Sequence, residues 1–149
     1  MEQLGATSQL SLQINLIQEL AEIPSVTFVG GTSEFIQGFR KDLKDIDISI
    51  PNPDILRKFG YVFRGENNSL YGLSGKRGFI KNNGTLIDIF IDPPPEFIMV
   101  GEFKCETVES MLNLSRKTLK HNSMMLSANN LDKLINRVHR LESYTKKAL

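Results

Sequence analysis

Three aspartates in two apolar segments are the residues of this chain best suited to chemistry. Asp45 and Asp47 alternate with isoleucines. In a β-strand this alternation places both carboxylates on one face, about 7 Å apart, and the isoleucines on the other. Aspartate is disfavoured in strands, and neighbouring carboxylates repel each other unless a cation lies between them. The segment therefore predicts a site for a divalent metal ion, with a solvated edge strand as the alternative interpretation.

A third carboxylate lies in a second segment of the same kind. Residues 85–92 also alternate, which places Asp88 and Asp92 on one face. Asp88 can face the first two aspartates if the two strands are neighbours in a sheet, so we predict that it is a third metal ligand. Asp92 precedes three prolines, which stop a strand, and we predict a turn residue there.

Two glycines precede the first acidic segment. Gly30 and Gly31 follow the apolar residues 26–29 and come directly before Thr32 and Ser33, at the expected start of a helix. Glycine allows a sharp turn and a close approach to the backbone, and the free amides of a helix N-terminus favour phosphate. The pattern predicts a phosphate-binding turn or, in the alternative, a tight turn without a ligand. A phosphate site beside a metal site points to a nucleoside triphosphate.

Basic residues accompany these segments. Arg40, Lys41 and Lys44 lead into the first acidic strand, and we expect them either to contact phosphate or to form a solvated loop face. Lys76 and Arg77 are expected in a turn, where they would contact the triphosphate or the acceptor, or only solvent. Two metal ions that neutralise the attacking and leaving oxygens of an in-line displacement would complete such a site.

The spacing of these residues resembles the signature of the DNA polymerase beta-like nucleotidyltransferase superfamily. The matching residues are an apolar residue with Gly30-Gly31, then Gly38 and Arg40, then Lys44-Asp45-Ile46-Asp47. Within that superfamily the pattern is most similar to the small nucleotidyltransferases that include abortive-infection-type toxins and the minimal nucleotidyltransferases. The resemblance covers roughly residues 24–92.

The resemblance implies an enzyme that uses Mg²⁺ or Mn²⁺ to transfer a nucleoside monophosphate from a nucleoside triphosphate to an acceptor hydroxyl, with release of pyrophosphate. A catalytically silent nucleotide-binding or regulatory module of the same fold is the alternative. Carried over residue by residue, the resemblance implies that Asp45, Asp47 and Asp88 are the catalytic and metal-binding residues, and that Gly30, Gly31, Thr32, Ser33, Arg40 and Lys44 bind the nucleotide.

The sequence departs from the superfamily pattern at two positions. Lys44 stands where many minimal members carry Ser or Thr, and Thr32 stands where Ser is common. The preferred nucleotide and the acceptor therefore stay open, with a tRNA end, a protein hydroxyl and a small molecule as candidates. A net charge of +1 argues weakly against a large RNA, but the basic residues near the site argue the other way.

The elements that must position these residues predict an α+β fold, with a mixed β-sheet flanked by helices and a C-terminal helical pair. We expect one domain over residues 1–149, with a sheet-containing core at 1–105 and helices at 106–149. Helices are predicted at 8–22, 32–37, 54–59, 108–119 and from Ser127 or Asn129 onward, and strands at 26–29, 45–50, 61–64, 69–73, 78–81, 85–92 and, as one extended piece, 96–105.

The composition sets broad limits. A chain of 149 residues with 40% hydrophobic and 23% charged residues is typical of an ordinary globular domain. The single cysteine, Cys105, excludes an internal disulfide, and we predict a core thiol rather than a nucleophile. No secretory or membrane-length apolar segment is visible, so we expect a cytoplasmic protein without a membrane partner.

Overall fold

The computed structural model describes residues 2–67, 76–80, 85–90, 96–122, 124 and 126–148. Within these residues one mixed sheet has the strand order β3-β4-β5-β2-β1-β7-β6. The strands are β1 (Thr27–Phe28), β2 (Ile46–Ser49), β3 (Val62–Asn67), β4 (Lys76–Ile80), β5 (Leu86–Phe90), β6 (Phe97–Val100) and β7 (Phe103–Glu106). The helices are α1 (Glu2–Ala21), α2 (Gly30–Ile36), α3 (Ile55–Lys58), α4 (Val108–Asn122) and α5 (Ala128–Ala148).

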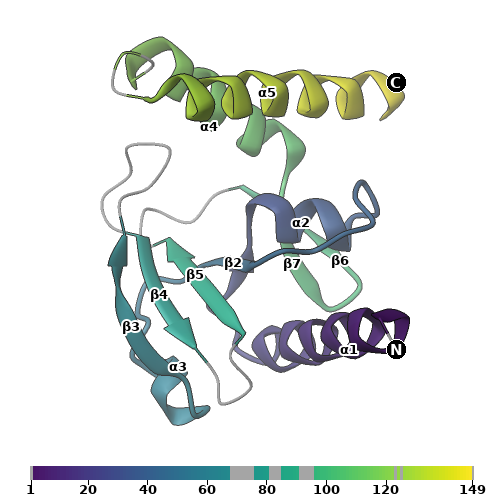
Figure 1. Ribbon diagram of the computed structural model, residues 1–149, viewed down its shortest axis with the longest axis vertical. Coiled ribbons are helices and arrows are strands. Elements are labelled where there is room, and N and C mark those ends of the chain that lie inside the picture. Colours follow the sequence, from purple (N-terminus) through teal and green to yellow (C-terminus); the bar gives the residue numbers. More distant parts are fainter. Residues whose placement is uncertain are drawn as a thin grey trace.

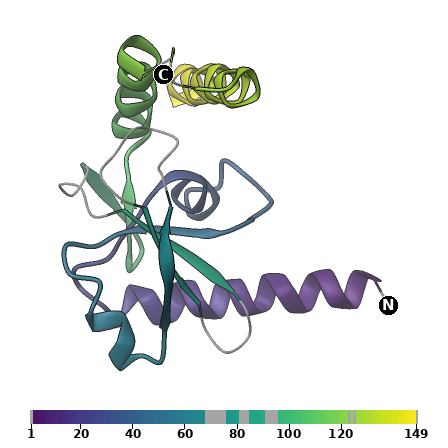
Figure 2. The same ribbon diagram turned by 60° about the vertical axis from the view of Figure 1, so that its left-hand side comes forward.

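The helices form layers around the sheet. In Figure 1, α1 lies at the bottom, α2 lies beside β2 and β7, and α5 runs across the top of the molecule. Turning the view shows α4 and α5 next to each other, above α2 (Figure 2). The predicted α+β fold class with a C-terminal helical pair is confirmed. No helix in the described part of the chain is long and apolar enough to cross a bilayer.

The apolar half of each alternating strand builds the main core. Ile46 and Ile48 of β2 and Ile87 and Ile89 of β5 are fully buried in one hydrophobic cluster. Burial of each such side chain contributes about 1.5–3 kcal/mol to the free energy of unfolding. Helix α1 adds leucine and isoleucine side chains to the same cluster. The aspartates that alternate with these isoleucines are therefore presented on the opposite side of the sheet.

A second, smaller cluster holds α4 and α5 together. Met111 and Leu112 of α4 pack with Val138, Leu141 and Tyr144 of α5. These positions recur at helical spacing, so one stripe of each helix faces the other. The remaining faces of α5 are left to contact the sheet-containing core or solvent.

The structure differs from the predicted elements at several boundaries. Helix α2 begins at Gly30 rather than at Thr32, and α1 extends to Glu2, ahead of the predicted start at residue 8. Lys76 and Arg77 lie in strand β4, where they pair with β5, and not in a turn. The strand was predicted only at 78–81, where apolar residues mark it. Backbone pairing with β5 does not require apolar side chains, so the strand also includes the two basic residues.

The predicted extended piece at 96–105 is a hairpin of β6 and β7. Val100 pairs with Phe103 across a two-residue turn, in which Gly101 has φ +62°. A positive φ at the first central position is the requirement of the tight turns that join antiparallel strands. The predicted strand at 69–73, the hairpin turn at 82–84 and Asp92 lie outside the described residues.

Candidate functional site

Two of the three aspartates are brought together by strand pairing. Strand β2 pairs in parallel with β5, and Asp47 lies directly opposite Asp88 in the register. Because paired strands lie about 4.8 Å apart, the two carboxylates project side by side from the same face. The side chain of Asp88 is only 2% exposed. The site therefore contains a buried carboxylate beside a second, partly exposed one.

A cavity of about 210 Å³ lies over these two side chains. Asp45 also lines it, from the position just before β2. Of the residues implied in nucleotide binding, Gly31, Arg40 and Lys44 line the cavity as well. Its charged lining residues are of both signs. We call Asp45, Asp47 and Asp88 the aspartate wall, and Arg40, Lys44 and Arg137 the basic wall.

The two glycines let charged side chains approach the backbone. A Cβ at Gly31 would lie 2.8 Å from Nη1 of Arg40, and a Cβ at Gly30 would lie 3.4 Å from Oδ2 of Asp47. Gly30 also has φ +55°, which side-chain-bearing residues rarely adopt. Its amide donates to Oε1 of Glu106 at 3.3 Å. The first amide of the predicted phosphate-binding turn is thus held by a carboxylate of the protein.

The hydroxyls that follow the glycines hold the site together from inside. Thr32 and Ser33 are fully buried and do not line the cavity. Oγ1 of Thr32 accepts from the amide of Asp47 at 2.8 Å and donates to the carbonyl of Asp45 at 3.3 Å. The Ser33 hydroxyl donates to the carbonyl of Glu106 at 2.7 Å. In this conformation these side chains position the acidic strand and β7.

A buried glutamate connects α2 to α5. Glu34 is 0% exposed and accepts hydrogen bonds from Arg140, at 2.9 and 3.3 Å, and from the hydroxyl of Tyr144, at 3.1 Å. Arg40 and Arg137 also lie within ion-pair distance of its carboxylate, each at 3.8 Å. One carboxylate therefore faces three guanidinium groups, and two of those groups belong to the basic wall.

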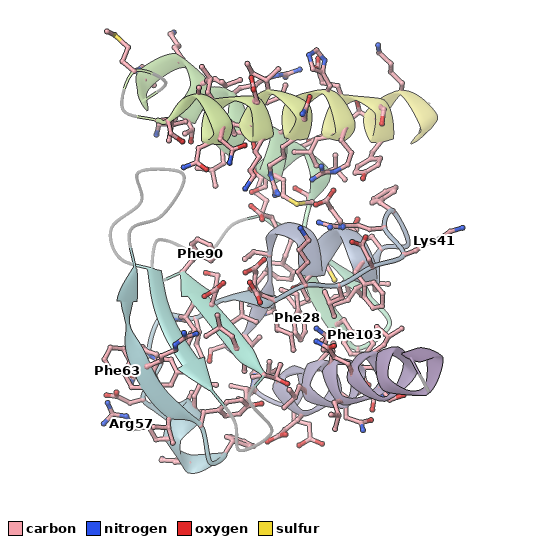
Figure 3. All side chains as sticks on the ribbon, in the orientation of Figure 1. Phe28, Lys41, Arg57, Phe63, Phe90 and Phe103 are labelled. Atoms are coloured by element: carbon pink, nitrogen blue, oxygen red, sulfur yellow. The ribbon has the colours of Figure 1, made fainter. Side chains whose placement is uncertain are left out.

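Sequence reasoning missed this connection. Glu34 lies within an otherwise uncharged helix, and Arg137 and Arg140 lie a hundred residues away on the last helix. The one available signal was the spacing of the two arginines, which puts them on the same face of a helix. Three other basic residues proposed for the site do not line the cavity or cannot be placed. Lys41 points away from the body of the protein (Figure 3), and the side chains of Lys76 and Arg77 are not among those described.

Burial also affects the carboxylate beneath the glycine turn. Burial raises the pKa of Glu106, although hydrogen bonds from Ser110 and the amide of Gly30, together with the charge of Arg137, act in the opposite direction. The neighbouring thiol of Cys105 is fully buried, and burial raises its pKa to about 11. A thiol of this kind is a poor nucleophile at neutral pH, in agreement with the predicted core role.

The aspartate wall fits a magnesium site. Among the described residues no group of three or more His, Cys, Asp and Glu side chains is gathered closely enough to hold a metal ion alone. Mg²⁺ keeps several waters and is usually held by one or two carboxylates together with substrate phosphates, rather than by a cage made of protein only. The adjacent Asp47 and Asp88, with Asp45 in the same cavity, supply oxygen ligands of that kind.

Comparison with known proteins identifies the fold. No protein-family model matches the sequence, and no curated protein is significantly similar to it. The structure is similar to the crystal structure of the Megavirus polyadenylate synthase, with a TM-score of 0.62 and 16% sequence identity. That match covers 88% of this chain and 30% of the viral protein, so this chain spans less than a third of the viral protein's length.

Two proteins of Helicobacter pylori are also similar in structure. JHP933 matches with a TM-score of 0.50 and 12% identity over 95% of this chain and 75% of JHP933. A candidate nucleotidyltransferase from the same organism matches with a TM-score of 0.50 and 12% identity over 96% of this chain and 79% of that protein. At these levels of identity the likeness concerns the fold, and the chain has a nucleotidyltransferase fold.

Proposed function

We propose that this protein is a nucleotidyltransferase that depends on Mg²⁺ or Mn²⁺. The observation that carries the proposal is a cavity lined by both the aspartate wall and the basic wall. A metal-bound triphosphate is complementary to this lining, because its metal ions bind carboxylate oxygens and its phosphates bind cationic donors. The fold shared with the structures described above supports the same function.

The three aspartates of the cavity have different roles in the proposed reaction. Asp47 and Asp88 would hold the metal from adjacent strands, and Asp45, just before β2, would add a third carboxylate to the same cavity. When bound, the ions neutralise the charge that develops on the attacking and leaving oxygens. Thr32 keeps Asp45 and Asp47 in register through the two hydrogen bonds of its hydroxyl.

The basic wall would hold the triphosphate. Arg40 and Arg137 supply planar guanidinium groups that match phosphate geometry, and Lys44 adds a point charge. Gly30 and Gly31 leave space for Asp47 and Arg40 to lie against the turn, which would place the Arg40 guanidinium for the phosphates. Ser33, together with Thr32, contributes by positioning this turn.

The reaction forms one bond and breaks one. The acceptor hydroxyl oxygen bonds to the α-phosphorus, the bond between the α-phosphorus and the bridging oxygen breaks, and pyrophosphate leaves. Asp88 is the carboxylate that we assign to receive the hydroxyl proton. The buried position of Asp88 excludes bulk water from that proton transfer.

Transfer of label from each α-labelled nucleoside triphosphate into the RNA, protein and small-molecule fractions of a cell extract tests the proposal. The native protein should label one fraction in the presence of Mg²⁺ or Mn²⁺, and Asp45→Asn/Asp47→Asn should not. Asp54→Asn is a matched control, because Asp54 is exposed and makes no side-chain capping bond at α3. Nucleotide that binds tightly but is never transferred would instead identify a catalytically silent module.

A further inference from the structure

Charge is distributed unequally along the chain. Residues 108–149 contain eight Lys and Arg but three Asp and Glu, whereas residues 1–107 contain ten Lys and Arg and fourteen Asp and Glu. The near-zero total therefore hides an excess of positive charge on α4 and α5. Such an asymmetry within one chain is typical of proteins that contact polyanions. The near-zero net charge of the chain is therefore no reason to exclude a nucleic-acid acceptor at α4 and α5.

One face of α5 carries only amide and basic side chains over its first half. At 3.6 residues per turn, positions 129, 133, 136, 137 and 140 fall on the same side of the helix. Asn129, Lys133 and Asn136 are exposed there, and Arg137 is partly buried. Asp132, also exposed, borders this face next to Asn136, whereas Glu142 lies on the opposite side of the helix and pairs with Arg116 of α4.

The exposed members of this face, Asn129, Lys133 and Asn136, belong to neither hydrophobic cluster. Together with Arg137 they are hereafter called the α5 track. The apolar stripe of α5 is directed to α4 through side chains that include Val138 and Leu141. In Figure 1 the first half of α5 extends beyond α2 toward the β3 side of the sheet, and its end, at Arg137, reaches Glu34 of α2. The track leads from exposed residues to Arg137, which lines the cavity.

We propose that the α5 track binds a single-stranded polynucleotide and directs its terminal hydroxyl into the cavity, which makes a nucleic acid the acceptor. This inference rests on the proposed function. Lysine and arginine contact phosphates, and asparagine amides both donate to and accept from base edges. From residue 129 to residue 137 the track is about 12 Å long, the length of roughly three stacked nucleotides. A small-molecule acceptor would leave such a surface without a use.

The test compares two lysines on opposite sides of α5. Lys133 lies on the track, whereas Lys146 is also exposed but falls on the other side of the helix. Lys133→Glu and Lys146→Glu make the same change in charge, and neither residue belongs to the hydrophobic clusters. Both are introduced into the Asp45→Asn/Asp47→Asn protein, so that binding is measured without turnover.

The probe is a fluorescein-labelled single-stranded RNA of about 20 nucleotides, several times the roughly three nucleotides that the track spans. Binding is followed by fluorescence anisotropy over a series of salt concentrations. We expect Lys133→Glu to weaken binding several-fold and to lower the slope of log Kd against log salt by about one. Lys146→Glu should leave both quantities nearly unchanged. Equal effects of the two variants, or no binding at low salt, would overturn the proposal. A DNA strand of the same sequence shows whether the sugar matters.

The two proposals fail in different ways. Binding to RNA that depends on Lys133, without any transfer by the native protein, would leave the α5 track standing and remove the catalytic function. Transfer into a protein or small-molecule fraction, with unchanged rates in Lys133→Glu, would leave the catalytic function standing and remove the role of the α5 track. Label transferred to the RNA end by the native protein, and reduced in Lys133→Glu but not in Lys146→Glu, would support both.

Discussion

Asp47 and Asp88 are register partners in a parallel pair of strands, β2 and β5, at the middle of the sheet. Their carboxylates are held next to each other by backbone hydrogen bonds and by the isoleucines that flank each of them in the core. The two negative charges repel each other, which destabilises the folded state. A cation bound between them would remove this repulsion. Several consequences can be measured.

Replacing Asp88 with Asn should abolish transfer without unfolding the protein. We expect activity to fall by at least about 100-fold, the loss typical of removing a group that stabilises charge at a reaction centre. The melting temperature without metal should stay the same or rise, because the repulsion with Asp47 is removed. Mg²⁺ should raise the melting temperature of the native protein but not that of Asp88→Asn. Calorimetry with and without Mg²⁺ checks this, and a large loss of stability in the variant would contradict it.

The Thr32 hydroxyl should contribute measurably to stability. Thr32→Val keeps the shape of the side chain but leaves the buried amide of Asp47 without its acceptor at 2.8 Å, which costs about 1–3 kcal/mol. Thr32→Ser retains the hydroxyl and should lose less. Urea unfolding of the two variants gives the difference. If valine and serine were equivalent at this position, the hydroxyl would have no such role.

Among the residues that connect α2 to α5, Glu34 should cost the most free energy of unfolding when it is replaced. Glu34→Ala leaves Arg140 without its hydrogen-bonded carboxylate, and we expect a loss of about 3 kcal/mol, as when one partner of a buried pair is removed. Tyr144→Phe removes one hydrogen bond to the same carboxylate and should cost about 1 kcal/mol.

The ion pair between Arg116 and Glu142 provides the control for Glu34. Its atoms are 3.0 Å apart, but the Arg116 side chain is 52% exposed. An exposed pair of this kind contributes between zero and about 1 kcal/mol, so Arg116→Ala should have little effect on denaturant unfolding. A loss as large as that of Glu34→Ala would show that burial does not distinguish the two contacts.

Stability should fall as the pH rises through the pKa of Glu106. Burial raises the pKa of this carboxyl above its ordinary value of 4.5, so the native state binds the proton more tightly than the unfolded state. The resulting contribution to the free energy of unfolding is fully present below about pH 4.5 and is lost as the pH rises through the native pKa. Glu106→Gln removes this ionisation. Thermal unfolding across that range should show a steeper decline for the native protein than for Glu106→Gln, and parallel curves would refute the assignment.

Local patterns in the sequence were sufficient to predict the parts of the fold that depend on near neighbours. The alternation of isoleucine and aspartate over residues 45–48 predicted strand β2 and the separation of its two faces, because side-chain direction in a strand alternates with each residue. The Gly30-Gly31 pair predicted a strand-to-helix turn, because glycine allows the sharp change of backbone direction that such a turn requires. The same local patterns misplaced the start of α2 and missed the hairpin of β6 and β7.

The arrangement of the site was decided by the tertiary structure. Whether Asp88 lies beside Asp47 depends on which strands pair and in which register, and alternation alone does not specify either. Glu34 and Arg137 are about a hundred residues apart in sequence, and only the packing of α5 brings them within 3.8 Å. The sequence thus determined which residues could hold metal and phosphate. Long-range packing decided that the last helix supplies part of the basic wall. The reason is that the burial of apolar faces positions a helix without regard to its place along the chain.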